Sequence, residues 1–372
     1  MELRQYQSTD CYTSLLGMGC MRFPTLKNGE VDYEKTEQII DYAYEHGVNY
    51  FDTAYVYHGG KSELLIGQML KKYPRESFFL ADKMPGWEVK TIEDVTRIFD
   101  EQLKRCQVDY FDFYLCHSLT AEGLKIYEQV DIIGFLDQKK KEGKIRRLGF
   151  SFHDKPPVLK AILDKYDWDF VQIQLNYMDW TLQDAKRQYE LIEAKGIPCI
   201  VMEPVRGGTL AALSDEACAY FKQANPNRSV ASWAIRYAAS LPNVLTVLSG
   251  MSNMEQIQDN VATMTDFEPL HEADYKTIET ALEIYRKNIT IPCTGCKYCI
   301  DCPKGIDIPG IFKISNDFAI SKNRGAFKES YGRLPDGRTA ADCVGCRKCV
   351  SLCPQSIQIP EELAKIKELA AK

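Results

Sequence analysis

The sequence lacks any apolar run near the roughly 20 residues that a membrane-spanning helix needs. It also lacks an excess of positive charge. The 46 Lys and Arg residues stand against 52 Asp and Glu residues, for a formal net charge of −6, so no broad basic surface favours nucleic acid. Residues 1–14 lack the apolar core of a secretory signal. We therefore expect a cytoplasmic protein with neither a nucleic acid nor a membrane as partner.

Disulfides are rare in that compartment, so the abundance of cysteine needs another explanation. The chain has 14 cysteines, and the eight that follow residue 292 form two dense clusters. Clustered cysteines in such a protein indicate a metal centre. We expect the six scattered cysteines to be small buried side chains or inert thiols: Cys11, Cys20, Cys106, Cys116, Cys199 and Cys218.

Residues 14–260 alternate short apolar segments with longer amphipathic ones. Among the amphipathic segments, 31–47 ends at a glycine suited to a helix C-cap, and 91–107 opens with Thr91 and Asp94, which fit a capping box. Repeated strand-then-helix units predict the α/β class and a (β/α)8 TIM barrel. An open doubly wound sheet is disfavoured, because no GxGxxG motif follows the first strand. The predicted strands are 14–20, 48–54, 77–83, 110–117, 145–151, 170–176, 197–203 and 244–250.

The amino-acid composition changes at Ile291 and Pro292, after which cysteine, glycine and proline become frequent. Just before this point, residues 261–290 predict a closing helix. The last residues, 360–372, predict a short helix with a proline in its first turn. We therefore predict a barrel domain over 1–288 and a small C-terminal domain over 289–372.

Polar side chains mark the C-terminal ends of the second, third and fourth predicted strands, the rim where TIM barrels place catalytic groups. Asp52, Lys83 and His117 end these strands, and Tyr57 lies in the loop after the second. A tyrosine can protonate a carbonyl oxygen, although its ordinary pKa is about 10. The Lys83 ammonium would lower that pKa, Asp52 would fix Lys83, and His117 would hydrogen-bond the substrate oxygen. Together the four indicate carbonyl reduction by hydride transfer.

Several segments resemble the aldo-keto reductase family. They are GVNYFDTAYVYHGGKSELLIG, GMGCMRFP, DYFDFYLCH and GKIRRLGFSFHD, and the resemblance covers about residues 10–265. It implies a catalytic tetrad of Asp52, Tyr57, Lys83 and His117, in which Tyr57 rather than Tyr55 donates the proton. It also implies NADP(H) as cofactor and a small-molecule carbonyl or alcohol as substrate.

The same resemblance implies a set of cofactor contacts. Ser151 and Gln172, on the fifth and sixth strands, would hold the nicotinamide carboxamide. Residues 249–260 resemble the loop and helix that clamp the adenosine phosphates, where a helix N-terminus favours phosphate. This loop and helix offer Ser249, Gly250, Ser252, Gln256 and Asn260, while Arg206, Gly207 and Gly208 after the seventh strand would cover the pyrophosphate.

Three departures from the family pattern bear on the cofactor. Phe152 and His153 stand where many members have Asn, and Met202 stands where many have an aromatic that stacks on nicotinamide. Polar or small residues, including Gln256, replace the Lys and Arg often seen around the 2′-phosphate. NAD(H), and a flavin in the same rim pocket, therefore remain alternatives to NADP(H).

The two cysteine clusters form the only internal repeat. The second fits C-x2-C-x2-C-x3-C-P, the bacterial ferredoxin pattern, and the first is one residue shorter in its last gap. Structural zinc is the alternative, but it usually takes two separated C-x2-C pairs. The pattern therefore favours two [4Fe-4S] clusters in a ferredoxin-like domain. The ligands are Cys293, Cys296, Cys299 and Cys302 in the first run, and Cys343, Cys346, Cys349 and Cys353 in the second.

In the ferredoxin pattern the fourth cysteine of each run ligates the other cluster. Cluster one would then take Cys353 with the first triplet, and cluster two would take Cys302 with the second. Because the first run is short, ligation of one cluster by each whole run stays open. A barrel with this appended module resembles an iron–sulfur branch of the aldo-keto reductases through residue 360.

Three functions are compatible with these features. The first is an NADP(H)-dependent oxidoreductase whose clusters transfer electrons, with a redox protein as a possible partner. A nicotinamide moves two electrons at once and a cluster moves one, so a flavin or a radical-tolerant substrate would help to couple them. The second is an electron-transfer subunit whose barrel docks a partner or binds a flavin. In the third, the clusters are structural only.

Overall fold

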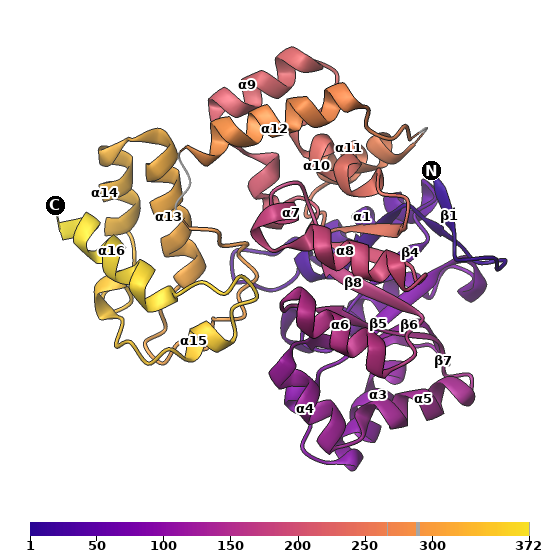
Figure 1. Ribbon diagram of the computed structural model, residues 1–372. Coiled ribbons are helices and arrows are strands. Elements are labelled where there is room, and N and C mark those ends of the chain that lie inside the picture. Colours follow the sequence, from indigo (N-terminus) through magenta and orange to yellow (C-terminus); the bar gives the residue numbers. More distant parts are fainter. Residues whose placement is uncertain (266, 288–290, 372) are drawn as a thin grey trace. The chain divides into compact units, whose positions relative to one another are not determined.

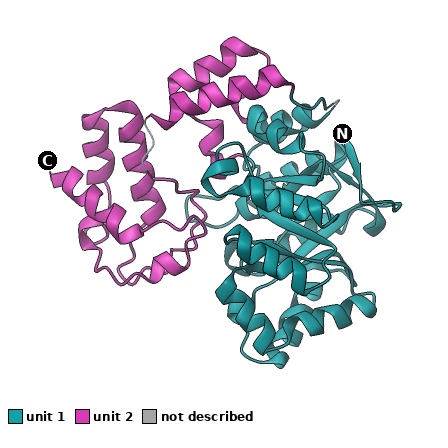
Figure 2. Ribbon diagram, viewed as in Figure 1, with its two compact units in different colours: residues 1–204, 232–270 teal, residues 205–231, 271–372 magenta. Residues whose placement is uncertain are grey.

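The computed structural model describes residues 1–265, 267–287 and 291–371. It divides into two compact units (Figure 2): Met1–Pro204 with Ser232–Leu270, and Val205–Ala231 with His271–Lys372. The predicted domain boundary at 288/289 falls outside the described residues. No helix in the described part of the chain is long and apolar enough to cross a membrane.

The first unit is built on a closed barrel of parallel strands in the order β10-β3-β4-β5-β6-β7-β8-β9. Pairing of β10 with β3 closes the barrel and aligns Val247 with Leu16. Each strand overlaps one of the eight predicted segments, so the predicted TIM barrel is confirmed. The strands are β3 (Leu16–Gly19), β4 (Tyr50–Asp52), β5 (Phe79–Met84), β6 (Phe111–Leu119), β7 (Ile145–Phe152), β8 (Phe170–Gln174), β9 (Cys199–Met202) and β10 (Val244–Ser249).

Helices surround these strands (Figure 1). The first ends just before Gly47, which has a φ of +87°, and the third begins with the predicted capping box of Thr91 and Asp94. The third helix buries Val95, Ile98 and Phe99, the spacing that places side chains on one helix face. The helices are α1 (Tyr33–Glu45), α2 (Ser62–Leu70), α3 (Ile92–Cys106), α4 (Ala121–Gln129), α5 (Ile132–Lys141), α6 (Pro156–Lys165), α7 (Asp179–Leu182), α8 (Ala185–Ala194), α10 (Val230–Ala239) and α11 (Met254–Met264).

A short antiparallel hairpin, β1 (Leu3–Gln5) and β2 (Tyr12–Ser14), precedes the barrel and was not predicted. Its turn buries Tyr6 and Cys11 in one cluster with Tyr50, Phe113 and Phe170 from the barrel interior. The Tyr6 hydroxyl also donates to the Asp169 carbonyl oxygen at 2.9 Å. The hairpin thus packs at the end where the strands begin, away from the strand ends that carry the predicted catalytic groups.

The described residues of the second unit form helices joined by loops, with no β-strand among them. Its α9 (Asp215–Ala224) packs against α12 (Glu272–Arg286). The predicted closing helix is corrected: residues 261–264 belong to α11, α12 covers only 272–286, and 288–290 lie outside the described residues. Four more helices follow: α13 (Ile308–Ser321), α14 (Arg324–Gly332), α15 (Lys348–Ser351) and α16 (Ile359–Ala371), the last beginning near Pro360 as predicted.

The two cysteine runs have nearly the same local backbone, which confirms the repeat. Gly295 and Gly345, each two residues after the first cysteine of its run, both have a φ of +66°. Each run continues into a helix, α13 or α16, with proline at its second position. The paired isoleucines between run and helix enter one core: Ile306 and Ile308 after the first run, Ile357 and Ile359 after the second.

Candidate active site and metal centre

Two strand ends and a loop bring Asp52, Lys83 and Tyr57 into direct contact. Lys83 Nζ lies 2.6 Å from Asp52 Oδ1, 2.7 Å from the Thr53 carbonyl oxygen and 3.4 Å from the Tyr57 hydroxyl oxygen. The ring of His117 meets the ring of Tyr57 edge to face, with centroids 6.0 Å apart. All four predicted tetrad side chains are buried, so their charges and dipoles interact through a medium less polarisable than water.

The surroundings of Tyr57 raise the pKa of its hydroxyl well above 10. Burial is the largest cause, followed by the negative charge of Asp52. The net direction is opposite to the lowering expected from Lys83, because burial and the negative charges around Tyr57 dominate. The Lys83 ammonium, which would favour the phenolate, is itself paired with Asp52 at 2.6 Å. Tyr57 consequently holds its proton at neutral pH, as a proton donor must.

His117 is neutral for a related reason. Burial lowers the pKa of its imidazole well below 6.5, and the Lys83 charge lowers it further. Its Nδ1 atom is buried without a hydrogen-bond partner among the described residues. The ring of Trp87, 47% exposed, lies 4.9 Å from the His117 ring, centroid to centroid. A neutral imidazole can donate a hydrogen bond to a substrate oxygen without adding charge to the site.

Tyr127, from α4, fixes the loops around His117. Its hydroxyl oxygen accepts hydrogen bonds from the backbone N–H groups of Gly86 and His117, at 3.2 and 2.8 Å, and donates one to the Met84 carbonyl. This ties the end of β5 to β6. Sequence reasoning missed both Tyr127 and Trp87, because neither stands at a strand end and an aromatic on an amphipathic helix ordinarily indicates core packing.

Ser151 and Gln172 are register partners on β7 and β8. The Ser151 hydroxyl oxygen accepts a hydrogen bond from the Ser118 N–H at 2.7 Å, where Ser118 has a φ of +56°. The Gln172 amide oxygen is buried and finds no partner in the described part of the chain. Leaving a buried acceptor unsatisfied costs about 1–3 kcal/mol. This oxygen therefore marks a place for a donor such as a carboxamide N–H, which fits the predicted nicotinamide site.

The predicted phosphate loop after β10 is tied together by its own side chains. Asn260 Nδ2 donates to Ser249 Oγ at 2.9 Å, and the Ser252 N–H donates to Gln256 Oε1 at 2.7 Å. A Cβ added to Gly250 would lie 3.0 Å from Arg22 Cβ. The structure therefore brings together all five predicted loop residues.

Arg22 is a basic residue of this region that sequence reasoning missed. Its carbonyl oxygen accepts from the Ser252 hydroxyl at 2.6 Å, and its guanidinium pairs with Glu203 at 2.9 Å. Glu203 has a φ of +56° at the end of β9. The available signal was the lone arginine in GMGCMRFP, next to the first strand end.

Arg206 is placed differently from its predicted role. It begins the 3-10 helix η5 (Arg206–Ala211) and belongs to the second unit, with Gly207 and Gly208. Its guanidinium is 1% exposed and donates to the Pro292 carbonyl oxygen at 3.0 Å and to Gln355 Oε1 at 2.9 Å. A buried guanidinium held in this way is not presented to a pyrophosphate. Gly207 and Gly208 keep positive φ values of 64° and 93°.

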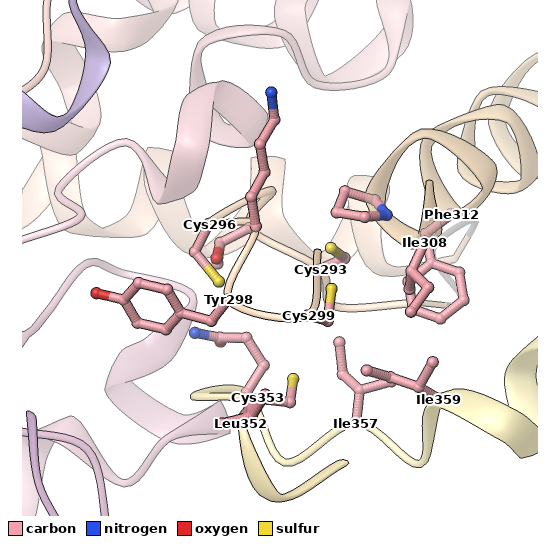
Figure 3. Close-up of a pocket in the computed structure, with 14 residues that line it drawn as sticks. Cys293, Cys296, Tyr298, Cys299, Ile308, Phe312, Leu352, Cys353, Ile357 and Ile359 are labelled. Atoms are coloured by element: carbon pink, nitrogen blue, oxygen red, sulfur yellow. The ribbon is translucent and has the colours of Figure 1, made fainter. Parts of the chain in front are cut away.

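Cysteines from both runs line one cavity in the second unit. The sulfur atoms of Cys293, Cys296, Cys299 and Cys353 face the same space, beside an apolar wall that includes Phe312 (Figure 3). Burial raises the pKa of Cys299 to about 12, and the thiols of the other three raise it as well. The fourth cysteine at this cavity thus comes from the opposite run.

The remaining cysteines form a second group. Cys302, Cys346 and Cys349 line a neighbouring cavity, which Cys299 also borders. Burial raises the pKa of Cys349, and the thiols that raise it further are those of Cys346, Cys343 and Cys302. Among the described residues, no three His, Cys, Asp or Glu side chains are arranged to hold a single metal ion.

The donor set of these cavities fits iron–sulfur clusters. Each group offers four cysteine sulfurs, and backbone turns with positive φ lie within both runs, at Gly295 and Gly345, as in the anion-binding nests of many iron–sulfur sites. The six scattered cysteines differ: five are buried and Cys218 is partly buried. Burial raises the pKa of every one of these six thiols. This agrees with the expectation of inert thiols.

Comparison with known proteins identifies both parts of the chain. The aldo/keto reductase family matches residues 15–283, and the 4Fe-4S dicluster domain matches residues 292–358. The L-galactose dehydrogenase of Arabidopsis thaliana is 27% identical over 318 residues, covering 78% of this chain and 97% of that protein. The NADH-specific methylglyoxal reductase of Escherichia coli K12 is 25% identical over 304 residues, covering 69% and 91%.

Among solved structures, the holo form of aldo-keto reductase AKR11C1 from Bacillus halodurans has a TM-score of 0.63 and 25% identity. The match covers 76% of this chain and 96% of that one. The family match spans the complete eight-stranded barrel and its four buried polar side chains, and the dicluster match spans all eight clustered cysteines. The chain therefore belongs to the aldo/keto reductase family, as an oxidoreductase that carries a 4Fe-4S dicluster domain after its barrel.

Proposed function

We propose that the barrel catalyses reduction of a small carbonyl compound, or oxidation of the corresponding alcohol, with a nicotinamide dinucleotide. The observation that carries this proposal is the contact of Tyr57 with the buried Lys83–Asp52 pair. A phenol with a raised pKa, next to a fixed ammonium and a neutral imidazole, is an arrangement suited to giving one proton to a carbonyl oxygen. The compartment that we propose is the cytoplasm.

A bound nicotinamide supplies a hydride to the carbonyl carbon. As that carbon accepts the electron pair, its oxygen becomes basic enough to take the proton from Tyr57. The phenolate left on Tyr57 then lies 3.4 Å from the Lys83 ammonium, which stabilises it until water returns the proton. The neutral His117 donates a hydrogen bond to the same oxygen and orients it. Alcohol oxidation runs through the same contacts in reverse.

We propose NADP(H) as the cofactor, with NAD(H) as the alternative. Gln172 and Ser151 would hold the carboxamide, and the unsatisfied Gln172 oxygen supports that placement. The loop at residues 249–260, with Arg22 packed on it, would hold the phosphates. NAD(H) stays open because one relative is named an NADH-specific reductase, and because the loop lacks the basic residues of many members. Dissociation constants measured by fluorescence should favour NADP(H) modestly; equal or tighter NAD(H) binding would reject this preference.

We propose that the dicluster domain holds two [4Fe-4S] clusters with crossed ligation, because each cysteine group takes members from both runs. Their role is one-electron transfer with a redox protein, and Cys346 is exposed beside the second cavity. Zinc with no acid-labile sulfide in anaerobic protein would overturn this assignment. The competing function is an electron-transfer subunit whose barrel docks a partner or binds a flavin. Flavin analysis and activity assays on the same anaerobic preparation separate these functions.

The test of the reductase proposal is a pair of tyrosine variants. Tyr57→Phe keeps the ring and removes the proton donor, so carbonyl-dependent oxidation of the nicotinamide should fall by about 10²–10⁴-fold while cofactor affinity is retained. Tyr55→Phe is the matched control, because its hydroxyl bonds Glu101 at 3.0 Å, outside the tetrad. It should keep nearly full activity. Wild-type turnover by Tyr57→Phe would reject Tyr57 as the acid.

A further inference from the structure

Arg206 is a buried cation that the reductase chemistry does not use. A buried guanidinium is costly unless its donors are satisfied, and two of its nitrogens are bonded to neutral oxygens, on Pro292 and Gln355. Pro292 directly precedes Cys293. Gln355 follows Cys353 by two residues and itself lines the first cysteine cavity. One side chain therefore bonds both chain segments that deliver cysteines to that cavity.

The repeat shows what is special about this contact. The positions equivalent to Pro292 and Gln355 beside the second cysteine group are Asp342 and Lys304, which precede Cys343 and follow Cys302 at the same offsets. Asp342 and Lys304 carry opposite formal charges, so these two positions together add no net formal charge. Beside the first group, the equivalent residues Pro292 and Gln355 are uncharged. They are joined by Arg206, which lies outside the repeat and is positively charged.

We propose that Arg206 is a positioning residue of cluster one, which holds its two ligand segments together and raises its reduction potential. The proposal rests on the iron–sulfur loading argued above. Reduction adds negative charge to a cluster already bound by four thiolates, and a nearby cation stabilises the more negative state more strongly. At the equivalent positions beside cluster two, the formal charges of Asp342 and Lys304 sum to zero. Arg206 therefore gives cluster one a contribution that makes it easier to reduce.

The experiment compares anaerobic wild-type protein with Arg206→Gln, Arg206→Lys and Lys304→Gln. Iron and acid-labile sulfide are counted, and both clusters are titrated by EPR against potential. Cys302→Ser, which under crossed ligation removes a ligand only from cluster two, assigns the cluster-one signal. We expect Arg206→Gln to lower the potential of cluster one and leave cluster two unchanged. Arg206→Lys keeps the charge and should keep most of the potential. Lys304→Gln should leave cluster one unchanged.

Loss of one cluster from Arg206→Gln alone would also support the positioning role. The iron content of Arg206→Gln would then fall from about eight to about four per chain, while Arg206→Lys would retain both clusters. Unchanged potentials and iron content in Arg206→Gln would overturn the proposal. So would an equal shift of both potentials, or a raised potential of cluster one. Absence of iron and sulfide from wild-type protein would instead overturn the iron–sulfur assignment itself, so the two failures are distinguishable.

Discussion

At the scale of single residues, burial moves the pKa values of Tyr57 and His117 in opposite directions with the same result. The pKa of the phenol is raised and the pKa of the imidazole is lowered, because desolvation disfavours the charged form of each group. Both groups are therefore neutral at pH 7. Within the group of four, the charge lies on Asp52 and Lys83, which are paired at 2.6 Å.

We predict that His117 stays neutral as pH falls through 6.5, the ordinary pKa of histidine. Carbon-detected histidine NMR between pH 7.5 and 5 measures this, and His117→Asn identifies the resonance among the five histidines of the chain. In the unfolded chain the His117 imidazole binds a proton below about pH 6.5, whereas in the folded chain it stays unprotonated. The contribution of His117 to stability is therefore complete above 6.5 and is lost as pH falls from there toward its folded pKa.

A comparison of unfolding curves checks the same linkage. The loss of stability between pH 7.5 and 5.5 should be smaller in His117→Asn than in the wild type, since the variant has no such proton to bind. A His117 resonance that titrates near 6.5, with equal acid sensitivity of both proteins, would contradict the prediction.

Sequence reasoning selected four residues that the structure brings together, because strand-end positions can be read from chain order. It did not find Trp87, Tyr127 or Arg22, whose roles depend on contacts between segments far apart in the chain. It expected the Lys83 charge to lower the pKa of Tyr57, whereas burial and the Asp52 charge raise that pKa on balance. Residue types indicated that Asp52, Lys83 and Tyr57 would meet, but the burial that dominates the pKa of Tyr57 follows only from the folded structure.

At the scale of elements, long periodic segments were predictable and short ones were not. All eight barrel strands were located, because each is an apolar segment between amphipathic helices. The hairpin of β1 and β2 has strands of three residues. Such strands are too short to show an alternation of apolar and polar residues. It is held by contacts of Tyr6 and Cys11 inside the barrel, which no local pattern encodes.

The cap of α3 provides a test at this scale. Thr91 Oγ1 accepts from the Asp94 N–H, and Asp94 Oδ2 accepts from the Thr91 N–H at 3.2 Å. Thr91→Ala should cost about 1 kcal/mol of stability, a fall of about 2–4 °C in the melting temperature of the barrel transition, with no change in activity. Circular dichroism during heating measures this.

Thr96→Ala is the matched control on the same helix. Thr96 is exposed in the helix interior and its hydroxyl donates to the Ile92 carbonyl at 3.1 Å, where alanine has the higher helix propensity. Its melting temperature should therefore equal or slightly exceed that of the wild type. An equal loss in both variants would show that the capping box makes no specific contribution.

At the scale of the whole molecule, crossed ligation can be tested with two serine variants. Cys302→Ser and Cys346→Ser should damage the same cluster, and the double variant should still hold the other, with about four irons per chain. Iron analysis and EPR measure this. If each run instead ligated its own cluster, the single variants would damage different clusters and the double variant would lose both.

Removal of everything after residue 288 is the second test at this scale. The product should be colourless and free of iron, and it should still bind nicotinamide dinucleotide, because the barrel strands and the proposed carboxamide contacts lie before residue 250. It should also be less stable than the whole chain, since Arg206 loses its bonds to Pro292 and Gln355. A brown truncated protein would contradict the assignment of the clusters to the C-terminal cysteines.

The interleaving of the cysteine groups has a consequence for biosynthesis. The first triplet is translated long before Cys353, with both α13 and α14 between them. Under crossed ligation, a cluster delivered to the nascent chain at that stage meets only three of its four protein ligands. Cys302, the remaining cysteine then available, belongs to the other cluster. Neither cluster can reach its final ligand set until the second run has been translated, so maturation of this domain must be a late, joint event, not two successive ones.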